Sequence, residues 1–198
     1  MRLHPAWLLL LIVLGGSDLV GMPATGPKIR IHTRFGVIEA ELQATEAPAT
    51  VANFLRYVDA GRYTGGRFHR TVKITPDNQP VSPVKIAVIQ GGVNPEFAEK
   101  DWPALPLERT RDTGLRHLDG TLSMARAGPD TATSDFFICI GDQPELDFGG
   151  KRNPDGQGFA AFGRVTKGMD VVRRIQQGPA EGQTLTPPVS ILNIERLP

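Results

Sequence analysis

The sequence has little cysteine and little net charge. Among 198 residues there is 1 cysteine, and the formal net charge is +1. A single cysteine, Cys139, cannot form a disulfide within the chain, and its apolar surroundings predict a buried side chain rather than a reactive thiol. The small net charge provides no field that would draw the protein to nucleic acid or to an anionic membrane surface.

The chain also lacks the residue patterns of hydrolases and metalloproteins. His69 has no serine or acidic partner at an interpretable spacing, and His32 and His117 are isolated along the sequence. A secreted hydrolase is therefore a distant alternative, because no nucleophile and base are paired. We expect no metal ion, since ligand pairs are missing, and no cofactor.

Glycine and proline are abundant instead. The 22 glycines and 17 prolines predict many turns and short strands rather than a helical bundle. Hydrophobic residues make up 40% and charged residues 22%, which is typical of a soluble globular protein. A chain of 198 residues is long enough for one sizeable core, so we expect one domain.

Residues 1–24 have the pattern of a signal peptide. A short polar start is followed by the apolar run Ala6–Leu14 and then by small residues, of which Ser17 and Ala24 both suit a cleavage site. The run is too short to span a bilayer, which favours a signal peptide over the alternative of a retained membrane anchor. We therefore expect an exported, periplasmic protein with no stable membrane insertion once the signal is removed.

Short apolar runs between turns predict a β-rich fold. Ile29–Thr33 and Ile38–Leu42 alternate apolar and polar residues around a turn, which predicts an antiparallel hairpin. Thr75–Pro83 contains three prolines and no periodicity, so it predicts an exposed loop. Further strands are predicted at Arg67–Val72, Ile86–Gln90, Thr121–Ala125, Phe136–Ile140, Phe159–Val165 and Val189–Ile194.

Two segments have helical periodicity. After Pro48, which suits a first helical turn, apolar residues recur at i, i+3, i+4 and i+7 from Val51 to Val58, and Gly61 suits a helix end. A second helix is predicted over Met169–Gln176. Two helices and about eight strands fit a closed barrel capped at both ends.

Three short segments carry the functional signal. They are Phe68-His69-Arg70, Gln90-Gly91-Gly92 and Ser134-Asp135-Phe136-Phe137-Ile138. Together they offer a cation, a neutral hydrogen-bonding amide and an apolar wall, but no nucleophile and no metal ligand set. This combination suits a reaction that makes and breaks no bond, in which an apolar ring is held while a neighbouring amide twists.

The order of these segments resembles the cyclophilins, which are peptidyl-prolyl cis-trans isomerases. The resemblance runs from about Ile29 to Ile194. The shared motifs are Thr50-Val51-Ala52-Asn53-Phe54, Phe68-His69-Arg70, Gln90-Gly91-Gly92, Gly120-Thr121-Leu122-Ser123-Met124-Ala125, Ser134-Asp135-Phe136-Phe137-Ile138 and Phe162-Gly163-Arg164-Val165. Met124-Ala125-Arg126 and Gly158-Phe159-Ala160 resemble the bacterial, exported branch.

The resemblance implies a fold, a site and a set of substrates. It implies an eight-stranded antiparallel barrel with two capping helices over residues 25–198. Arg70 would be the catalytic residue, and Gln90 would hydrogen-bond the substrate backbone. The other substrate-binding residues would be Phe68, Val88, Ala125, Phe137, Leu146 and Phe159, with Phe137 as the floor of the proline pocket. The substrates would be proline-containing polypeptides whose folding the protein assists after export, and we expect a monomer.

The sequence departs from the family pattern near the pocket. Ala87 stands where a phenylalanine is usual, which predicts looser packing of proline, and Val88 replaces a methionine. Asp135 stands where glutamine is common, and Glu145 where some members carry a tryptophan, which predicts weak binding of cyclosporin. The Thr75–Pro83 segment is additional, so the alternative is a weakly catalytic chaperone or binding module that uses it.

Overall fold

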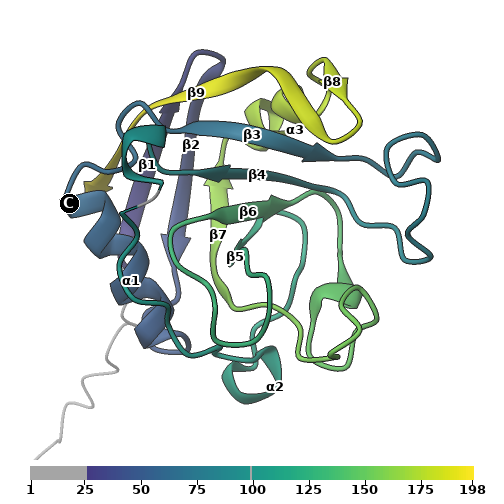
Figure 1. The fold of residues 1–198 in the computed structure, drawn as a ribbon. Coiled ribbons are helices and arrows are strands. Elements are labelled where there is room, and N and C mark those ends of the chain that lie inside the picture. Colours follow the sequence, from purple (N-terminus) through teal and green to yellow (C-terminus); the bar gives the residue numbers. More distant parts are fainter. Residues whose placement is uncertain (1–25, 99) are drawn as a thin grey trace, which may run out of the picture.

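The protein forms a closed antiparallel β-barrel. The structure, a computed structural model, describes residues 26–98 and 100–198, so the predicted signal peptide of residues 1–24 lies outside the described residues. The strands follow the order β1-β2-β7-β5-β6-β4-β3-β9-β8, and pairing of β1 with β9 closes eight of them into a ring. The remaining strand, β8, pairs only with β9 as a short hairpin at the rim (Figure 1).

The strands and helices occupy the following residues. The strands are β1 (Lys28–Thr33), β2 (Gly36–Leu42), β3 (Arg67–Val72), β4 (Val88–Gly92), β5 (Thr121–Met124), β6 (Phe136–Cys139), β7 (Ala161–Lys167), β8 (Ala180–Glu181) and β9 (Thr184–Leu197). The α-helices are α1 (Pro48–Asp59), α2 (Thr110–Thr113) and α3 (Met169–Gln176), and two 3-10 turns are η1 (Pro95–Phe97) and η2 (Pro144–Leu146).

The first hairpin is confirmed, and its register follows from its alternating sequence. Ile31 of β1 lies opposite Ile38 of β2, and both side chains are fully buried inside the barrel. The polar residues that alternate with these isoleucines along each strand face outward, as expected for a sheet with one solvated face. The prediction of a barrel with helices at its ends is likewise confirmed.

Helix α1 begins at Pro48 as predicted and buries its apolar stripe against the barrel. Its N-terminal N–H groups are not capped by the residue before the helix. Instead, the Glu108 carboxylate accepts hydrogen bonds from the backbone N–H of Ala49 at 3.1 Å and of Thr50 at 2.8 Å. This carboxylate also suits the positive end of the helix dipole.

Helix α3 spans Met169–Gln176, the range predicted from the sequence, and buries Val171, Val172 and Ile175. Helices α1 and α3 cover different ends of the barrel (Figure 1). The third helix, α2, was not predicted, because four residues are too few to show a periodic apolar stripe. Within the described residues, no helix is long and apolar enough to cross a bilayer.

Two apolar clusters, one on each face of strands β4 and β6, position the site. On β6, Phe136 and Ile138 point into the barrel, whereas Phe137 and Cys139 point to its outer side. The outer cluster is small: its buried members are Val72, Ile86, Val88, Phe137, Cys139 and Leu146. Cys139 is fully buried there, as predicted. A strand buried on both faces explains why the Phe136–Ile140 run is continuously apolar.

Candidate active site

A β-bulge on β3 turns Arg70 toward the outer cluster. Phe68 pairs with Gly91, but Arg70 pairs with Gln90, so His69 is an extra residue without its own partner on β4. A bulge changes the direction of the side chains that follow it. Phe68 consequently points into the barrel core, while Arg70 lies beside Gln90 and lines a cavity of about 470 Å³ on the outer side.

The guanidinium of Arg70 is held from two sides by neutral amides. Its Nη1 donates to Gln90 Oε1 at 2.9 Å, and its Nε and Nη2 donate to Gln183 Oε1 at 2.9 and 2.6 Å. Burial lowers the pKa of Arg70 from its usual value, and the nearby Arg152 cation lowers it further. Because arginine stays protonated in proteins, the cavity contains an oriented cation, and no carboxylate of residues 26–98 and 100–198 forms an ion pair with it.

Gln90 in turn is oriented by Asp135. Its Nε2 donates to Asp135 Oδ2 at 2.9 Å, and His69 Nε2 lies 3.5 Å from the same oxygen. The carboxylate occupies space that only a glycine leaves open, since a Cβ on Gly92 would lie 1.9 Å from Asp135 Oδ1. The motif Gln90-Gly91-Gly92 therefore places the amide and makes room for the group that orients it.

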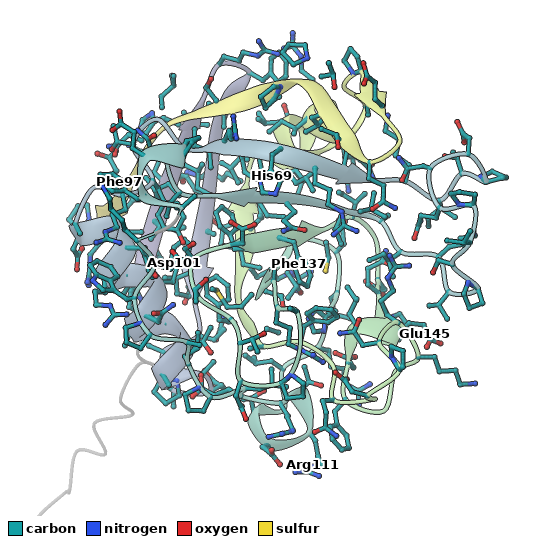
Figure 2. The ribbon with its side chains drawn as sticks, viewed as in Figure 1. His69, Phe97, Asp101, Arg111, Phe137 and Glu145 are labelled. Carbon is teal, nitrogen blue, oxygen red and sulfur yellow. The ribbon has the colours of Figure 1, made fainter. Side chains whose placement is uncertain are left out.

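The outer cluster forms an apolar floor beside Arg70. Phe137 is 4% exposed and meets Phe159 edge-to-face, with ring centroids 5.4 Å apart. In Figure 2, Phe137 lies below the strand that carries His69, whereas Glu145 lies farther out, near the edge of the molecule. The predicted residues that line the cavity are Arg70, Val88, Gln90, Ala125, Phe137, Leu146 and Phe159.

Two expectations about individual positions do not match this geometry. Phe68 does not line the cavity; it is fully buried in the barrel and packs edge-to-face on Phe136, because the bulge separates it from Arg70. Ala87 does not line the cavity either, and the neighbouring Ile86 does so in its place. Ile86 packs with Val88 in the outer cluster and so contributes an apolar side chain to that wall.

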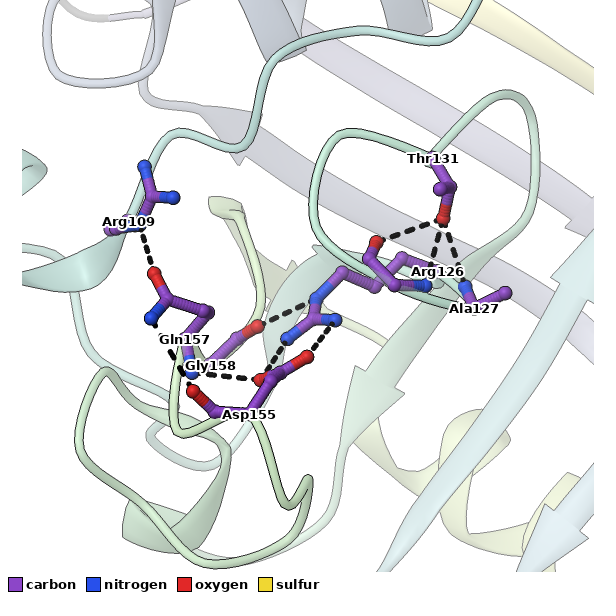
Figure 3. A network of polar contacts seen from close by, with 8 residues as sticks. Arg109, Arg126, Ala127, Thr131, Asp155, Gln157 and Gly158 are labelled. Atoms are coloured by element: carbon purple, nitrogen blue, oxygen red, sulfur yellow. Dashed lines mark hydrogen bonds and ion pairs between the residues drawn. The ribbon is translucent and has the colours of Figure 1, made fainter.

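A network of hydrogen bonds and one ion pair stabilises part of the cavity wall (Figure 3). The Arg126 side chain is 1% exposed and forms a bidentate pair with Asp155, with distances of 2.8 and 2.9 Å. Its Nε donates to Gly158 O at 2.8 Å, and its guanidinium carbon lies 4.9 Å from the centre of the Phe159 ring. Gln157 accepts from Arg109 Nε at 2.7 Å. This network holds in place the loop that carries Phe159 and so positions its ring at the cavity.

The Thr75–Pro83 segment is folded against the barrel and is only partly the exposed loop that was predicted. Asn78 and Gln79 are 7% and 2% exposed. The Asn78 side chain accepts from Lys73 N at 2.8 Å and donates to Gly182 O at 2.7 Å. Gln183 Nε2 donates to the Asn78 carbonyl at 2.9 Å. The additional segment is therefore connected to Arg70 through Gln183.

A buried Ser–His–Asp chain lies behind the floor. His117 Nδ1 is 2.7 Å from Asp147 Oδ1, and His117 Nε2 is 2.9 Å from Ser123 Oγ. This connectivity resembles that of a hydrolase, but Ser123 is fully buried, so no substrate carbonyl can reach its oxygen. The His117 ring stacks on Phe137 at 5.9 Å, which gives the chain a structural role beneath the pocket.

Sequence reasoning missed Gln183, which holds Arg70, and Arg152, which lines the cavity. Gln183 was missed because it lies 113 residues from Arg70 and joins it only in the folded barrel. Arg152 was missed because it lies in a loop without periodicity. The described residues 26–98 and 100–198 contain no group of three or more His, Cys, Asp or Glu side chains that could hold a metal ion.

Comparisons with known proteins agree with this geometry. A family profile described as "Cyclophilin type peptidyl-prolyl cis-trans isomerase/CLD" matches residues 28–196. A peptidyl-prolyl cis-trans isomerase from Streptomyces antibioticus is 39% identical over 149 residues, covering 75% of this chain and 82% of that protein. Peptidyl-prolyl cis-trans isomerase B from Escherichia coli is 34% identical over 157 residues, covering 79% and 87%.

A solved structure shares the fold. The crystal structure of a cyclophilin-type peptidyl-prolyl cis-trans isomerase from Cryptosporidium parvum superposes with a TM-score of 0.69 at 24% identity, covering 87% of this chain and 98% of that one. The chain therefore belongs to the cyclophilin-type peptidyl-prolyl cis-trans isomerases. Its activity is the cis-trans isomerisation of peptide bonds that precede proline.

Proposed function

We propose that the cavity between Arg70 and the outer cluster is the isomerase site and that Arg70 is the catalytic residue. The observation that carries this proposal is the position of the Arg70 guanidinium, which Gln90 and Gln183 hold beside an apolar floor. The proline ring would lie on Phe137 and against Val88, with the preceding amide next to the cation.

The chemistry of the reaction explains why a fixed cation suffices. Rotation about an X-Pro bond breaks amide conjugation and has a barrier of about 18–20 kcal/mol. In the twisted state the nitrogen becomes pyramidal and gains a lone pair, while the planar states have none to offer. A donor aimed at this nitrogen stabilises the twisted state more than either planar state, because the lone pair is available to accept a hydrogen bond only when conjugation is lost. A reduction of about 7 kcal/mol corresponds to roughly 10⁵-fold acceleration.

Gln90 is arranged to bind the substrate backbone. Its Oε1 faces Arg70, and one N–H of its amide faces Asp135, which fixes its orientation. A primary amide has two N–H donors, so a second donor is available for a substrate carbonyl. Because its side chain is already oriented, Gln90 would not need to move when the peptide binds.

Isomerisation of a proline peptide, followed by NMR exchange spectroscopy, tests the proposal. We expect Arg70→Ala to lower kcat/KM by about 100-fold or more, as for removal of a transition-state donor. We expect Arg70→Lys to restore only part of it, because an ammonium is more strongly hydrated and less rigid. Arg67→Ala is the matched control, because Arg67 lies on the same strand but does not line the cavity. Full turnover by Arg70→Ala would rule out the assigned role.

A second candidate function is a binding module that uses the Thr75–Pro83 segment. The supporting observation is the exposure of apolar side chains there: Val81 is 94% exposed, and the adjoining Ile74 is 63% exposed. Val81→Ser with Ile74→Ser would test it through binding of an unfolded, proline-free polypeptide. Loss of binding with retained isomerase activity would support this function, and unchanged binding would refute it.

We also propose that the substrates are exported proteins and that the protein acts as a monomer in the periplasm. The support is the signal-like pattern of residues 1–24. N-terminal sequencing of protein isolated from the periplasmic fraction tests export, and a new N-terminus near residue 18 or 25 is expected. Light scattering on the processed protein tests the monomeric state.

A further inference from the structure

Arg152 is a second cation at the same cavity. It lies in the loop after η2 and lines the cavity together with Arg70. Its Nη1 donates to Gln79 Oε1 at 2.9 Å, to Ser82 Oγ at 2.6 Å and to Val84 O at 2.7 Å. All three acceptors are neutral. The Thr75–Pro83 segment and the residue after it therefore fix the position of Arg152 without neutralising its charge.

The other charged groups at the cavity already have partners. Arg126 pairs with Asp155, and Asp135 is bound by Gln90 and His69. Within residues 26–98 and 100–198, no carboxylate forms an ion pair with Arg70 or Arg152. The cavity wall on this side consequently has two positive charges that lack a negative counterpart.

Both cations are partly removed from water. Burial lowers the pKa of Arg152 from its usual value, and the pKa of Arg70 is lowered by burial and by Arg152. An anion placed between or beside them would offset the desolvation and the mutual repulsion. The described hydrogen bonds of the Arg152 side chain all come from Nη1, so its Nε and Nη2 donors remain available to a ligand.

We propose that Arg152 forms a carboxylate-binding position beside the proline pocket, so that the enzyme favours peptides with Asp or Glu in a residue flanking the proline. This inference rests on the proposed isomerase site. A flanking residue is the appropriate one because each residue extends the chain by only about 3.5 Å. Arg152 borders the same 470 Å³ cavity as the proline floor, which limits how far along the peptide its partner can lie.

A guanidinium suits this role because it is rigid and matches the geometry of a carboxylate. The bonds to Gln79, Ser82 and Val84 hold it in place before the peptide binds. Little side-chain freedom would then be lost on binding. The competing interpretation is that Arg152 only holds the Thr75–Pro83 segment in place. In that case the charge of the substrate should have no effect on kcat/KM.

Matched peptides on the full-length protein distinguish these interpretations. Two pairs are needed: one with Glu or Gln immediately before proline, and one with Glu or Gln immediately after it. We expect the Glu peptide of one pair to exceed its Gln partner in kcat/KM by about fivefold, the size of a partly exposed ion pair. The ratio should fall toward one as ionic strength increases. The pair that shows it identifies the side of the proline that faces Arg152.

Variants assign the effect to Arg152. Arg152→Gln should bring the Glu-to-Gln ratio to about one, whereas Lys151→Gln, the neighbouring exposed cation, should leave it unchanged. If Arg152→Gln fails to fold, the Arg152 Nε–H signal of the wild type provides the readout, and it should shift more with the Glu peptide. Equal rates for both members of both pairs would overturn the carboxylate site alone. Failure to isomerise any peptide would overturn the proposed function itself.

Discussion

Gln183 accepts two hydrogen bonds from the Arg70 guanidinium, at 2.9 Å from Nε and 2.6 Å from Nη2. Gln183 belongs to the turn between β8 and β9, and its own Nε2 donates to the Asn78 carbonyl. The orientation of the proposed catalytic cation thus depends on a turn far away in the sequence and on the additional segment between β3 and β4.

Replacement of Gln183 should impair catalysis without removing a group that contacts substrate. We expect Gln183→Ala to lower kcat by about tenfold, roughly the value of one or two hydrogen bonds to a charged group, with a smaller effect on KM. The exposed Gln177→Ala is the matched control. The Nε–H signal of Arg70 should broaden or shift in the variant. An unchanged signal together with an unchanged kcat would refute a positioning role.

Loss of the Arg126 network should weaken substrate binding. Arg126→Ala leaves Asp155 without its partner and frees the loop that holds Phe159. We expect KM to rise more than kcat falls, with a loss of about 2–4 kcal/mol in unfolding free energy, because the cation is buried. Arg111→Ala removes an exposed pair with Asp112 and should change stability by less than about 1 kcal/mol. Equal effects of the two variants would contradict this account.

Gly92 should tolerate no side chain while Asp135 is present. The Cβ introduced by Gly92→Ala would lie 1.9 Å from Asp135 Oδ1, so we expect destabilisation of about 1–3 kcal/mol and lower activity. In an Asp135→Ala background the obstructing carboxylate is gone, so the same substitution should be much less harmful to stability. Gly128→Ala, where the nearest atom is 4.0 Å away, serves as the control. Additive effects in the double variant would argue against the clash.

The ionisation of Asp135 should lower stability at neutral pH. Burial raises the pKa of its carboxyl above the ordinary 3.8, although the Gln90 hydrogen bond and the His69 charge oppose the change. The folded protein therefore binds this proton more tightly than the unfolded chain does. The free energy of unfolding consequently falls as the pH rises from 3.8 through the raised folded-state pKa.

Asp135→Asn removes this pH-dependent loss. Relative to the wild type, the variant should gain stability across that pH window and keep the gain at pH 7. Denaturant unfolding at pH 3, 5 and 7 measures the difference. Asp112→Asn is a control of opposite sign, because its exposed pairing with Arg111 lowers the pKa of Asp112. A difference between wild type and Asp135→Asn that does not vary with pH would contradict the raised pKa.

The local spacing of apolar residues was sufficient to predict much of the fold. The first hairpin and helices α1 and α3 follow from the spacing of apolar residues, which depends on neighbours within one or two turns. The position of Phe68 could not be obtained in this way, because a regular strand would place Phe68 and Arg70 on the same face. The available signal was chemical: a large apolar ring and a cation seldom share one buried face, which favours a bulge between them.

The site was predictable only where its residues lie in recognisable motifs. The roles assigned to Arg70, Gln90 and Phe137 remain predictions, although these side chains do converge on one cavity. Gln183 and Arg152 lie in turns and loops whose contacts arise only when the barrel closes. Their side-chain hydrogen bonds join residues 68 or more positions apart, which no local pattern encodes.

The ring of strands closes where the last strand, β9, lies between β1 and β3. During synthesis, β1 and β3 are complete long before residues 184–197 exist, so both present unpaired backbone edges to other chains. Such edges invite aggregation until the final strand inserts. In the nascent chain, one edge of β1 and one edge of β3 therefore stay unpaired until the last fourteen-residue strand is available.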